Sequence, residues 1–193
     1  MVTKERLMVT NRRLVTAKGL NFYPTPAWGT QALLNEVTFI GCIHEPCCGD
    51  GAMSKVLIKN GYTVTSADIV DRGWFGVVQD FRTAIGPFDN VVTNPPFNIA
   101  EDLLEHALNL TSRKVCFLLR TAFLESKRRY NKFYKHNPPS LILVFSERLS
   151  MYPKGYKVKS GGTTSYAWFV WDNENKIKPI TQVLWIPPGL KNG

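Results

Sequence analysis

The chain has 193 residues, of which 44% are hydrophobic and 12% aromatic, so it can bury the core of one domain and is short for two. Its 24 lysine and arginine residues outnumber 15 acidic residues and give a formal net charge of +9. This excess favours nucleic acid as a partner, although basic residues can equally serve only to keep a small protein soluble. Because the sequence shows no apolar stretch of membrane-spanning or signal-peptide length, we expect a cytoplasmic protein that binds no membrane.

The four cysteines are Cys42, Cys47, Cys48 and Cys116. They lack the paired spacing of a zinc site, because two adjacent cysteines cannot easily turn both sulfurs toward one ion. They also show no disulfide framework, which is typical of proteins in a reducing compartment. We therefore expect no metal site in this chain.

Residues 1–20 are rich in basic side chains and show little hydrophobic pattern, so we expect an N-terminal arm followed by one domain over residues 21–193. In that domain short apolar runs alternate with helix-like stretches, which is typical of a parallel sheet covered by helices. The predicted fold is therefore α/β, with a seven-stranded, mostly parallel sheet. The last two strands are close enough in sequence for an antiparallel final hairpin. The predicted strands are 38–45, 62–68, 76–80, 88–93, 114–120, 141–147 and 165–172.

Three stretches between these strands have helical features. Apolar residues recur at helical spacing over residues 100–108 and more briefly over 53–57. The earlier of these two helices would begin at Asp50 or Gly51. A third candidate, residues 124–137, interleaves basic with aromatic side chains and ends at two prolines, which cannot continue a helix.

The segment His-Glu-Pro-Cys-Cys-Gly-Asp-Gly, residues 44–51, follows the first predicted strand and precedes a helix. Glycines at such a turn let the backbone approach a ligand, and the segment has neither the GxGxxG nor the GK[ST] pattern of nucleotide-phosphate loops. Asp68 ends the second predicted strand and Asp80 the third, so both are expected at the edge of the sheet where open α/β folds bind ligands. There Asp68 can accept from ribose hydroxyls and Asp80 from an adenine amino group, although either residue alone could be an ordinary turn aspartate.

The sharpest signal is Asn94-Pro95-Pro96-Phe97, directly after the fourth predicted strand. An aromatic amine is a weak nucleophile because its lone pair is delocalised into the ring, and two acceptors pulling on its hydrogens can restore nucleophilicity. The carboxamide oxygen of Asn94 and the carbonyl of Pro95 are suitable acceptors, while Phe97 offers a face for a planar base. Dipoles held in this way stabilise the positive charge that develops on such a nitrogen when it attacks an electrophile.

This NPPF segment resembles the [DNS]PP[YFW] motif of S-adenosylmethionine-dependent amino-methyltransferases, and residues 22–26, Phe-Tyr-Pro-Thr-Pro, look like their N-terminal cofactor motif. The order of the motifs resembles the gamma group, particularly small phage-type DNA N6-adenine methyltransferases, over about residues 22–186. The resemblance implies a Rossmann-like class I methyltransferase fold, S-adenosyl-L-methionine as cofactor and, for a phage-encoded protein, a place in the host cytoplasm. The residues it assigns to the target amine are Asn94, Pro95, Pro96 and Phe97, and those it assigns to the cofactor are Phe22, Tyr23, Pro24, Thr25, Glu45, Pro46, Cys47, Gly49, Gly51, Asp68, Ile69, Asp80, Phe81 and Asn94.

Within these assignments, Glu45 and the two glycines would line the methionine portion, Asp68 the ribose, and Asp80 with Phe81 the adenine. The chain departs from larger relatives because no long segment is left for an inserted target-recognition domain, which predicts low sequence specificity. Nucleic acid would then contact the arm, the 124–137 helix and the loop after residue 153, although a basic helix is often only a solvated face. The predicted substrate-binding residues are Arg120, Arg128, Lys132, Lys135, Lys154, Lys157 and Lys159.

The sequence therefore predicts methylation of adenine N6 in nucleic acid, with DNA favoured and the base flipped out of a duplex first. Three alternatives stay open. The first is an RNA adenine N6-methyltransferase, and the second is a protein glutamine N5-methyltransferase, whose similar motif usually ends in tyrosine where this chain has Phe97. The third is a catalytically silent nucleic-acid-binding module, against which the intact Asn94 and glycine loop argue.

Overall fold

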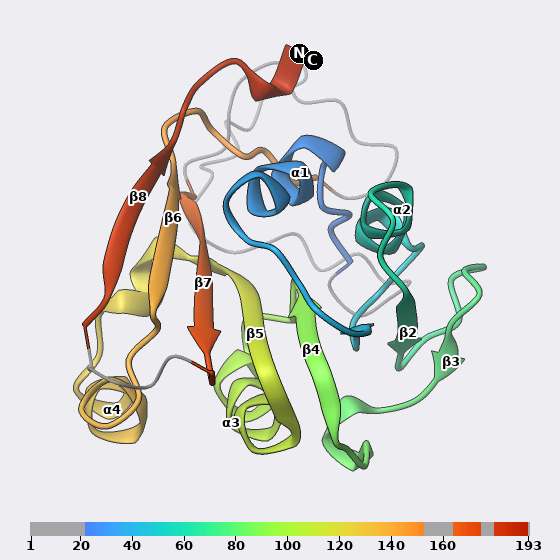
Figure 1. The fold of residues 1–193 in the computed structure, drawn as a ribbon, viewed down its shortest axis with the longest axis horizontal. Coiled ribbons are helices and arrows are strands. Elements are labelled where there is room, and N and C mark those ends of the chain that lie inside the picture. Colours follow the sequence, from blue (N-terminus) through green and yellow to red (C-terminus); the bar gives the residue numbers. More distant parts are fainter. Residues whose placement is uncertain (1–21, 153–163, 175–179, 193) are drawn as a thin grey trace, which may run out of the picture.

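The computed structural model describes residues 22–152, 164–174 and 180–192. The predicted arm, residues 1–20, lies outside this part, as do Lys154, Lys157 and Lys159. The described residues form one sheet with helices on both faces (Figure 1). None of the helices among them has the length and apolar character needed to cross a membrane.

The sheet has the strand order β3-β2-β1-β4-β5-β7-β6-β8. Neighbouring strands from β3 to β5 are parallel, β7 is antiparallel to both β5 and β6, and β8 is parallel to β6. The strands are β1 Ile43–Glu45, β2 Val64–Asp68, β3 Val77–Val78, β4 Phe88–Thr93, β5 Thr111–Arg120, β6 Leu141–Phe145, β7 Tyr166–Asp172 and β8 Gln182–Ile186.

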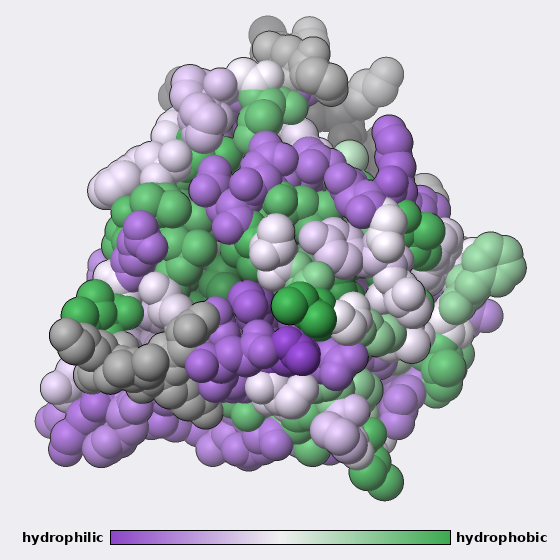
Figure 2. All heavy atoms as spheres, in the orientation of Figure 1, coloured by the Kyte–Doolittle hydropathy of each residue, from purple (hydrophilic) through white to green (hydrophobic). Residues whose placement is uncertain are grey.

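The predicted mostly parallel sheet and its antiparallel hairpin, formed by β6 and β7, are confirmed. The predicted number of strands is one too low, because the sheet has eight strands and the prediction omitted β8. This strand lies at the edge of the sheet, where Val183 and Trp185 are exposed. The face of the molecule in Figure 2 shows hydrophobic surface interspersed with hydrophilic surface. A half-exposed edge strand lacks the buried apolar run by which a central strand is recognised in a sequence.

Helices cover both faces of the sheet. On one face lie α1 Ala27–Glu36 and α2 Ala52–Lys59, and on the other lie α3 Ala100–Leu110 and α4 Lys127–Arg129, which continues as a π-helical turn over Tyr130–Tyr134. The predicted helices therefore occur, and α2 begins directly after Gly51. The sequence did not predict α1, since its buried positions include Gly29 and Thr30 as well as apolar residues. Short 3-10 turns occupy Phe81–Thr83, Thr121–Leu124 and Leu190–Asn192.

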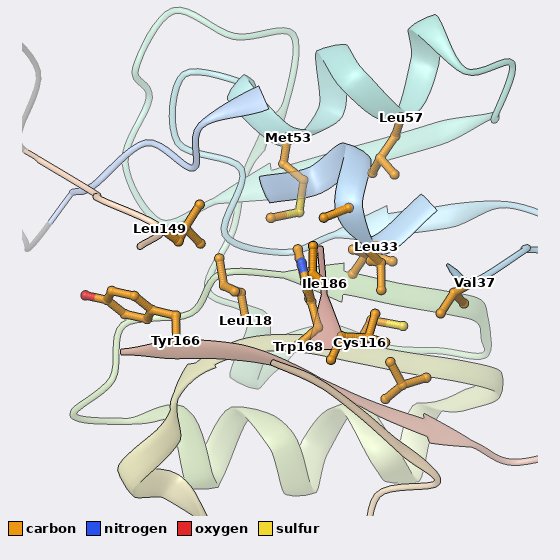
Figure 3. Packing of buried hydrophobic residues seen from close by; sticks show 14 of the residues in the cluster. Leu33, Val37, Met53, Leu57, Cys116, Leu118, Leu149, Tyr166, Trp168 and Ile186 are labelled. Carbon is orange, nitrogen blue, oxygen red and sulfur yellow. The ribbon is translucent and has the colours of Figure 1, made fainter. Parts of the chain in front are cut away.

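The central strands separate two apolar cores. In β5, residues 115–119 are all buried, because helices cover both faces of this strand. Cys116 and Leu118 point into the core beneath α1 and α2, where the indole of Trp168 donates a 2.8 Å hydrogen bond to the carbonyl of Gly29 (Figure 3). Phe117 lies in the opposite core, beneath α3. The double burial holds the central strands in place and so fixes the loops at their ends.

Candidate active site

The strands β1, β2, β4 and β5 are parallel, so their carboxyl ends meet at one edge of the sheet, which we call the carboxyl edge. The loop after β1 holds Gly49 at φ 56° and Gly51 at φ 75°, both in the left-handed region. A Cβ atom at Gly49 would collide with the ring of Phe22, and one at Gly51 with the ring of Trp74. Backbone conformation and close approach thus both require glycine at these two positions.

Asp68, the last residue of β2, joins the glycine loop. Its carboxylate accepts a 2.8 Å hydrogen bond from the backbone N–H of Gly49 and a 2.9 Å bond from that of Val70. The structure therefore brings Asp68 and the glycine loop together, as the sequence predicts. Each carboxylate oxygen has further lone pairs, so Asp68 can still accept hydrogen bonds from a ligand.

A small hollow that opens to solvent lies beside Asp68 at the carboxyl edge. Its wall combines backbone of the glycine loop, the acidic end of β2, the connection from β2 to β3, and the apolar residues of β3. The lining residues are Cys48, Gly49, Asp68, Val70, Asp71, Arg72, Trp74, Gly76, Val77 and Val78.

Glu45, the last residue of β1, lies beneath the glycine loop and is 2% exposed. The hydroxyl of Ser54 donates to its carboxyl group, and the Ser54 hydroxyl also lies 2.7 Å from that of Ser66. Burial raises the pKa of Glu45 to about 8, and the Ser54 hydrogen bond offsets only part of this effect. Glu45 is therefore neutral at pH 7 and belongs to a buried polar network under the predicted methionine site.

The structure does not bring Asp80 and Phe81 to the hollow. Asp80 caps the turn Phe81–Thr83, where hydrogen bonds and a 2.5 Å ion pair with Arg82 lower its pKa. Phe81 is 3% exposed, and its ring packs against His44 and His106 in the core. Their predicted contact with adenine stays a prediction without support from this placement, and so does that of Ile69, which is half-exposed outside the hollow.

Asn94, directly after β4, is held by the segment that precedes α1. Its Nδ2 lies 3.1 Å from Thr25 Oγ1, 3.3 Å from the Tyr23 carbonyl and 3.4 Å from Met151 Sδ. Because a backbone carbonyl can only accept, the nitrogen end of the amide must face these atoms. The opposite end of the amide, Oδ1, is therefore the acceptor that Asn94 can offer to another molecule.

The N-terminal motif and the NPPF motif thus meet in space, although about 70 residues separate them in the chain. Phe22 lies over Gly49, and the guanidinium of Arg72 lies 4.5 Å from its ring centroid. Pro24 is half-buried, Pro46 is buried, and Cys47 packs at the edge of the core beneath α3. Burial raises the pKa of the Cys47 thiol to about 12, which makes it a poor nucleophile.

Phe97 and Arg120 form a cluster with Tyr166 of β7 at the same edge. The rings of Phe97 and Tyr166 are 5.8 Å apart, and the Arg120 guanidinium lies 5.0 Å from the Phe97 centroid. Arg120 Nε is buried and has no hydrogen-bond partner among the described residues. The predicted position of Arg120 at the carboxyl edge is confirmed, and a base that stacks on Phe97 must use the other ring face or displace Arg120.

The basic helix is tied to α3 by ion pairs. Arg128 lies 2.7 Å and Arg129 3.0 Å from the carboxylate of Glu101, while Lys132 lies 2.8 Å from that of Glu105. Two of the predicted phosphate contacts, Arg128 and Lys132, therefore already have acidic partners. Lys135 is exposed and stays a predicted nucleic-acid contact.

Sequence reasoning missed Trp74, Met151 and Tyr166. Trp74 follows the predicted acidic position by six residues, in a connection whose path the sequence does not reveal. Met151 and Tyr166 come from segments remote from the motifs in the chain and reach Asn94 and Phe97 only through the sheet topology. Among the described residues, no group of three or more His, Cys, Asp and Glu side chains is arranged to hold a metal ion.

No family model matches this sequence. No curated protein matches it either. Solved structures do: a protein assigned to the class I S-adenosylmethionine-dependent methyltransferases of Listeria monocytogenes shares 15% identity at a TM-score of 0.54, over 84% of this chain and 63% of that one. A protein assigned as an RNA methyltransferase of Pyrococcus horikoshii shares 15% identity at a TM-score of 0.56, over 76% of this chain and 80% of that one.

A modification subunit assigned to a type I restriction enzyme of Vibrio vulnificus shares 12% identity at a TM-score of 0.57, over 90% of this chain and 49% of that one. This chain thus spans less than two thirds of the Listeria protein and about half of the Vibrio protein. Identities this low establish the architecture alone. The chain has the Rossmann-like fold of the class I S-adenosylmethionine-dependent methyltransferases.

Proposed function

We propose that this chain transfers a methyl group from S-adenosylmethionine to the N6 amino group of adenine in nucleic acid, with DNA favoured over RNA. The observation that carries the proposal is the fixed amide of Asn94, whose nitrogen is held by Thr25 and Tyr23 and whose oxygen is left to accept. These hydrogen bonds fix the orientation of the Asn94 amide before a substrate binds. An acceptor that is already oriented stabilises a developing positive charge without having to reorganise.

The residues at the carboxyl edge fit the cofactor. Gly49 and Gly51 allow the left-handed backbone that brings the loop to Asp68, and Asp68 at the end of β2 can accept hydrogen bonds from ribose hydroxyls. Bound there, S-adenosylmethionine supplies an electrophilic methyl group on a sulfonium. In the proposed reaction the bond between sulfur and methyl breaks, its electron pair stays on sulfur, and a bond from nitrogen to the methyl carbon forms.

The residues of this chain act on the amine. The Asn94 oxygen and the Pro95 carbonyl accept its two hydrogens, which returns electron density to the nitrogen and stabilises its developing positive charge. One of those protons then leaves to water, so no side chain with a shifted pKa is needed. Phe97 orients the base by contact with its planar ring, and Arg120 lies within reach of the same base or its phosphate.

The charge of the whole chain supports nucleic acid rather than protein as the substrate. A net charge of +9 raises the local concentration of a polyanion but does nothing for a glutamine side chain. Of the three proteins with this fold cited above, one is assigned as an RNA methyltransferase and one as the modification subunit of a restriction enzyme. The preference for DNA rests on the sequence resemblance to phage-type enzymes.

The proposal is tested by incubating the protein with S-adenosylmethionine labelled at the methyl group and with separate pools of DNA, RNA and protein. Digestion to nucleosides and amino acids then identifies the labelled product. Label in N6-methyladenine of DNA supports the proposal, and label in RNA alone corrects the substrate class. Label in N5-methylglutamine, or none in any pool while the cofactor still binds, overturns it.

A further inference from the structure

Trp74 lines the hollow although none of the sequence motifs includes it. Its indole rests against Gly51, the residue that caps α2, and Lys55 Nζ lies 4.9 Å from its ring centroid. The same ring forms part of the wall that contains Asp68 and Gly49. Trp74 therefore joins the glycine loop to the ribose-binding position proposed at the end of β2.

A chain of hydrogen bonds fixes the plane of this indole. Trp74 Nε1 lies 3.2 Å from Ser66 Oγ, Ser66 Oγ lies 2.7 Å from Ser54 Oγ, and Ser54 donates to the buried Glu45. An indole nitrogen can only donate, so each hydroxyl along the chain accepts from one neighbour and donates to the next. The relay is thus complete from Trp74 to the carboxyl of Glu45, and it spans β2, α2 and β1.

The neighbouring residue shows that the placement of Trp74 is specific. Phe75 is 98% exposed, whereas Trp74 is partly buried and hydrogen-bonded. The two aromatic residues are adjacent in the same connection from β2 to β3, yet only Trp74 is turned into the hollow. Phe75, whose ring meets that of Trp74 edge-on at 5.7 Å but does not line the hollow, therefore offers a control for the loss of an aromatic side chain from this connection.

We propose that Trp74 is a cofactor-binding residue: its indole, packed on the glycine loop, is a wall of the hollow against which the adenosine part of S-adenosylmethionine lies beside Asp68. Ser66 is the positioning residue, because it fixes the indole through the relay to Glu45 without touching the cofactor. The inference rests on the proposed function, since it assumes that the hollow beside Asp68 takes this cofactor. A planar, partly buried ring gives a nucleoside both apolar contact and a stacking surface.

The test is calorimetric binding of S-adenosylhomocysteine to the full chain, which needs no methyl acceptor and no turnover. Trp74→Ala should weaken binding about tenfold or more, because the loss of an aromatic contact of this kind costs on the order of a factor of ten. Ser66→Ala should weaken it about threefold, the typical effect of one neutral hydrogen bond. Phe75→Ala should bind within about twofold of the unaltered protein, because an exposed ring contributes little.

Each outcome separates the inference from the proposed function. If the unaltered protein does not bind S-adenosylhomocysteine, the proposed function itself is wrong. If it binds and Trp74→Ala binds equally well, or if Phe75→Ala loses as much affinity as Trp74→Ala, the role of Trp74 is overturned while the proposed function stands.

A second variant guards against loss of folding. Trp74→Phe keeps an aromatic ring in the hollow but removes the Nε1 donor, so its thermal unfolding should change little. We expect it to bind S-adenosylhomocysteine about threefold more weakly and to raise KM for S-adenosylmethionine with little change in kcat. Binding equal to that of the unaltered protein would overturn the relay, and a fall in kcat without a change in KM would overturn a role in cofactor binding.

Discussion

Asn94 illustrates how one side chain can have two tasks at the carboxyl edge. Its nitrogen donates hydrogen bonds to Tyr23 and Thr25 of the N-terminal segment, and its oxygen is proposed to accept a hydrogen bond from the reacting amine. We predict that Asn94→Ala lowers kcat about 10²-fold or more, by analogy with the loss of one oxyanion-hole donor. Single-turnover methylation of an adenine-containing oligonucleotide measures this change, and a rate equal to that of the unaltered protein would rule out the assigned role.

Thr25 provides the control for the structural task of Asn94. Thr25→Val removes one acceptor for Asn94 Nδ2 but leaves the proposed acceptor oxygen in place. The loss of a single neutral hydrogen bond is worth about 0.5 to 1.5 kcal/mol, so the rate should fall far less than in Asn94→Ala. Equal losses in the two variants would mean that Asn94 acts only by holding the N-terminal segment.

Asp68 is expected to act on the cofactor rather than on the rate. We predict that Asp68→Ala weakens binding of S-adenosylhomocysteine by about one to two powers of ten, since hydrogen bonds to charged groups contribute about 1.5 to 3 kcal/mol. Asp71→Ala is the matched control, because Asp71 also lines the hollow but accepts from the backbone of Gly73. If Asp71→Ala has the larger effect on calorimetric affinity, the ribose contact belongs to Asp71.

Glu45 predicts a dependence of stability on pH. Its pKa is about 8 in the folded protein against an ordinary 4.5, so from pH 4.5 to 8 the folded state holds one proton more than the unfolded state. Stability should therefore fall as pH rises through this window, by at most about 1.4 kcal/mol per pH unit. His44, whose pKa burial lowers to about 4, acts in the opposite direction below pH 6.5. Between pH 6.5 and 8 the effect of Glu45 on stability is therefore not opposed by that of His44.

Urea unfolding of the unaltered protein and of Glu45→Gln at several pH values measures this contribution. The glutamine keeps a polar partner for Ser54 but cannot ionise, so its stability should lack the decline between pH 6.5 and 8. Parallel pH profiles for the two proteins would contradict the assignment of a neutral, buried carboxyl group.

At the level of single residues, the sequence identified those whose chemistry a motif fixes and missed those that only the fold brings near. Asn94, Asp68 and the two glycines follow strands directly, so their place at the carboxyl edge could be inferred from strand order. Phe81 was assigned to the cofactor on a motif position, but its ring is needed in the core beside His44. No local pattern distinguishes these two uses of a phenylalanine.

At the level of elements, strong periodicity identified α3 and the central strands, whereas weak patterns concealed α1 and β8. Burial on both faces makes β5 an uninterrupted apolar run, which is easily recognised. The edge strand β8 is mostly exposed, and α1 buries a glycine and a threonine beside its apolar residues. The sequence also did not reveal the acidic partners of the basic helix, because its ion pairs join it to α3, about 27 residues earlier in the chain.

These ion pairs change what is expected of the basic helix. Arg128 and Lys132 would have to leave Glu101 and Glu105 before they could contact phosphate, whereas Lys127 and Lys135 are exposed. We predict that Lys127 and Lys135 changed together to glutamine flatten the slope of log affinity against log salt by about one to two units. Oligonucleotide binding measured from low to moderate salt provides the slopes.

The pair Arg128→Gln and Lys132→Gln is the comparison for that experiment. We expect it to lower the unfolding temperature, because it breaks the contacts with α3, and to change the salt slope by less than about half a unit. A larger slope change for this pair than for Lys127 and Lys135 would mean that phosphate displaces the acidic partners. An unchanged slope in both variants would mean that the basic helix is only a solvated surface and does not contact phosphate.

At the level of the whole molecule, the described residues all belong to one sheet, the helices on its faces and their connections. Base-edge readout requires several side chains held rigidly in a groove of the nucleic acid. Within this part of the chain, Arg120 and Tyr166 lie against Phe97 of the NPPF motif, and Thr25 and Met151 contact Asn94. The architecture therefore favours recognition of the target base and of phosphates over recognition of a long sequence.

We predict accordingly that methylation by this chain has low sequence specificity. Adenines should be modified in many contexts, with a preference that extends over at most about three bases, because few side chains can reach base edges. Mapping of methylated positions in a library of random duplexes and single strands measures the preference. Single strands should react faster, since a base in a duplex must first be unpaired and flipped at a cost of a few kcal/mol. A long palindromic site would contradict this prediction and would require that residues outside the described part read the sequence.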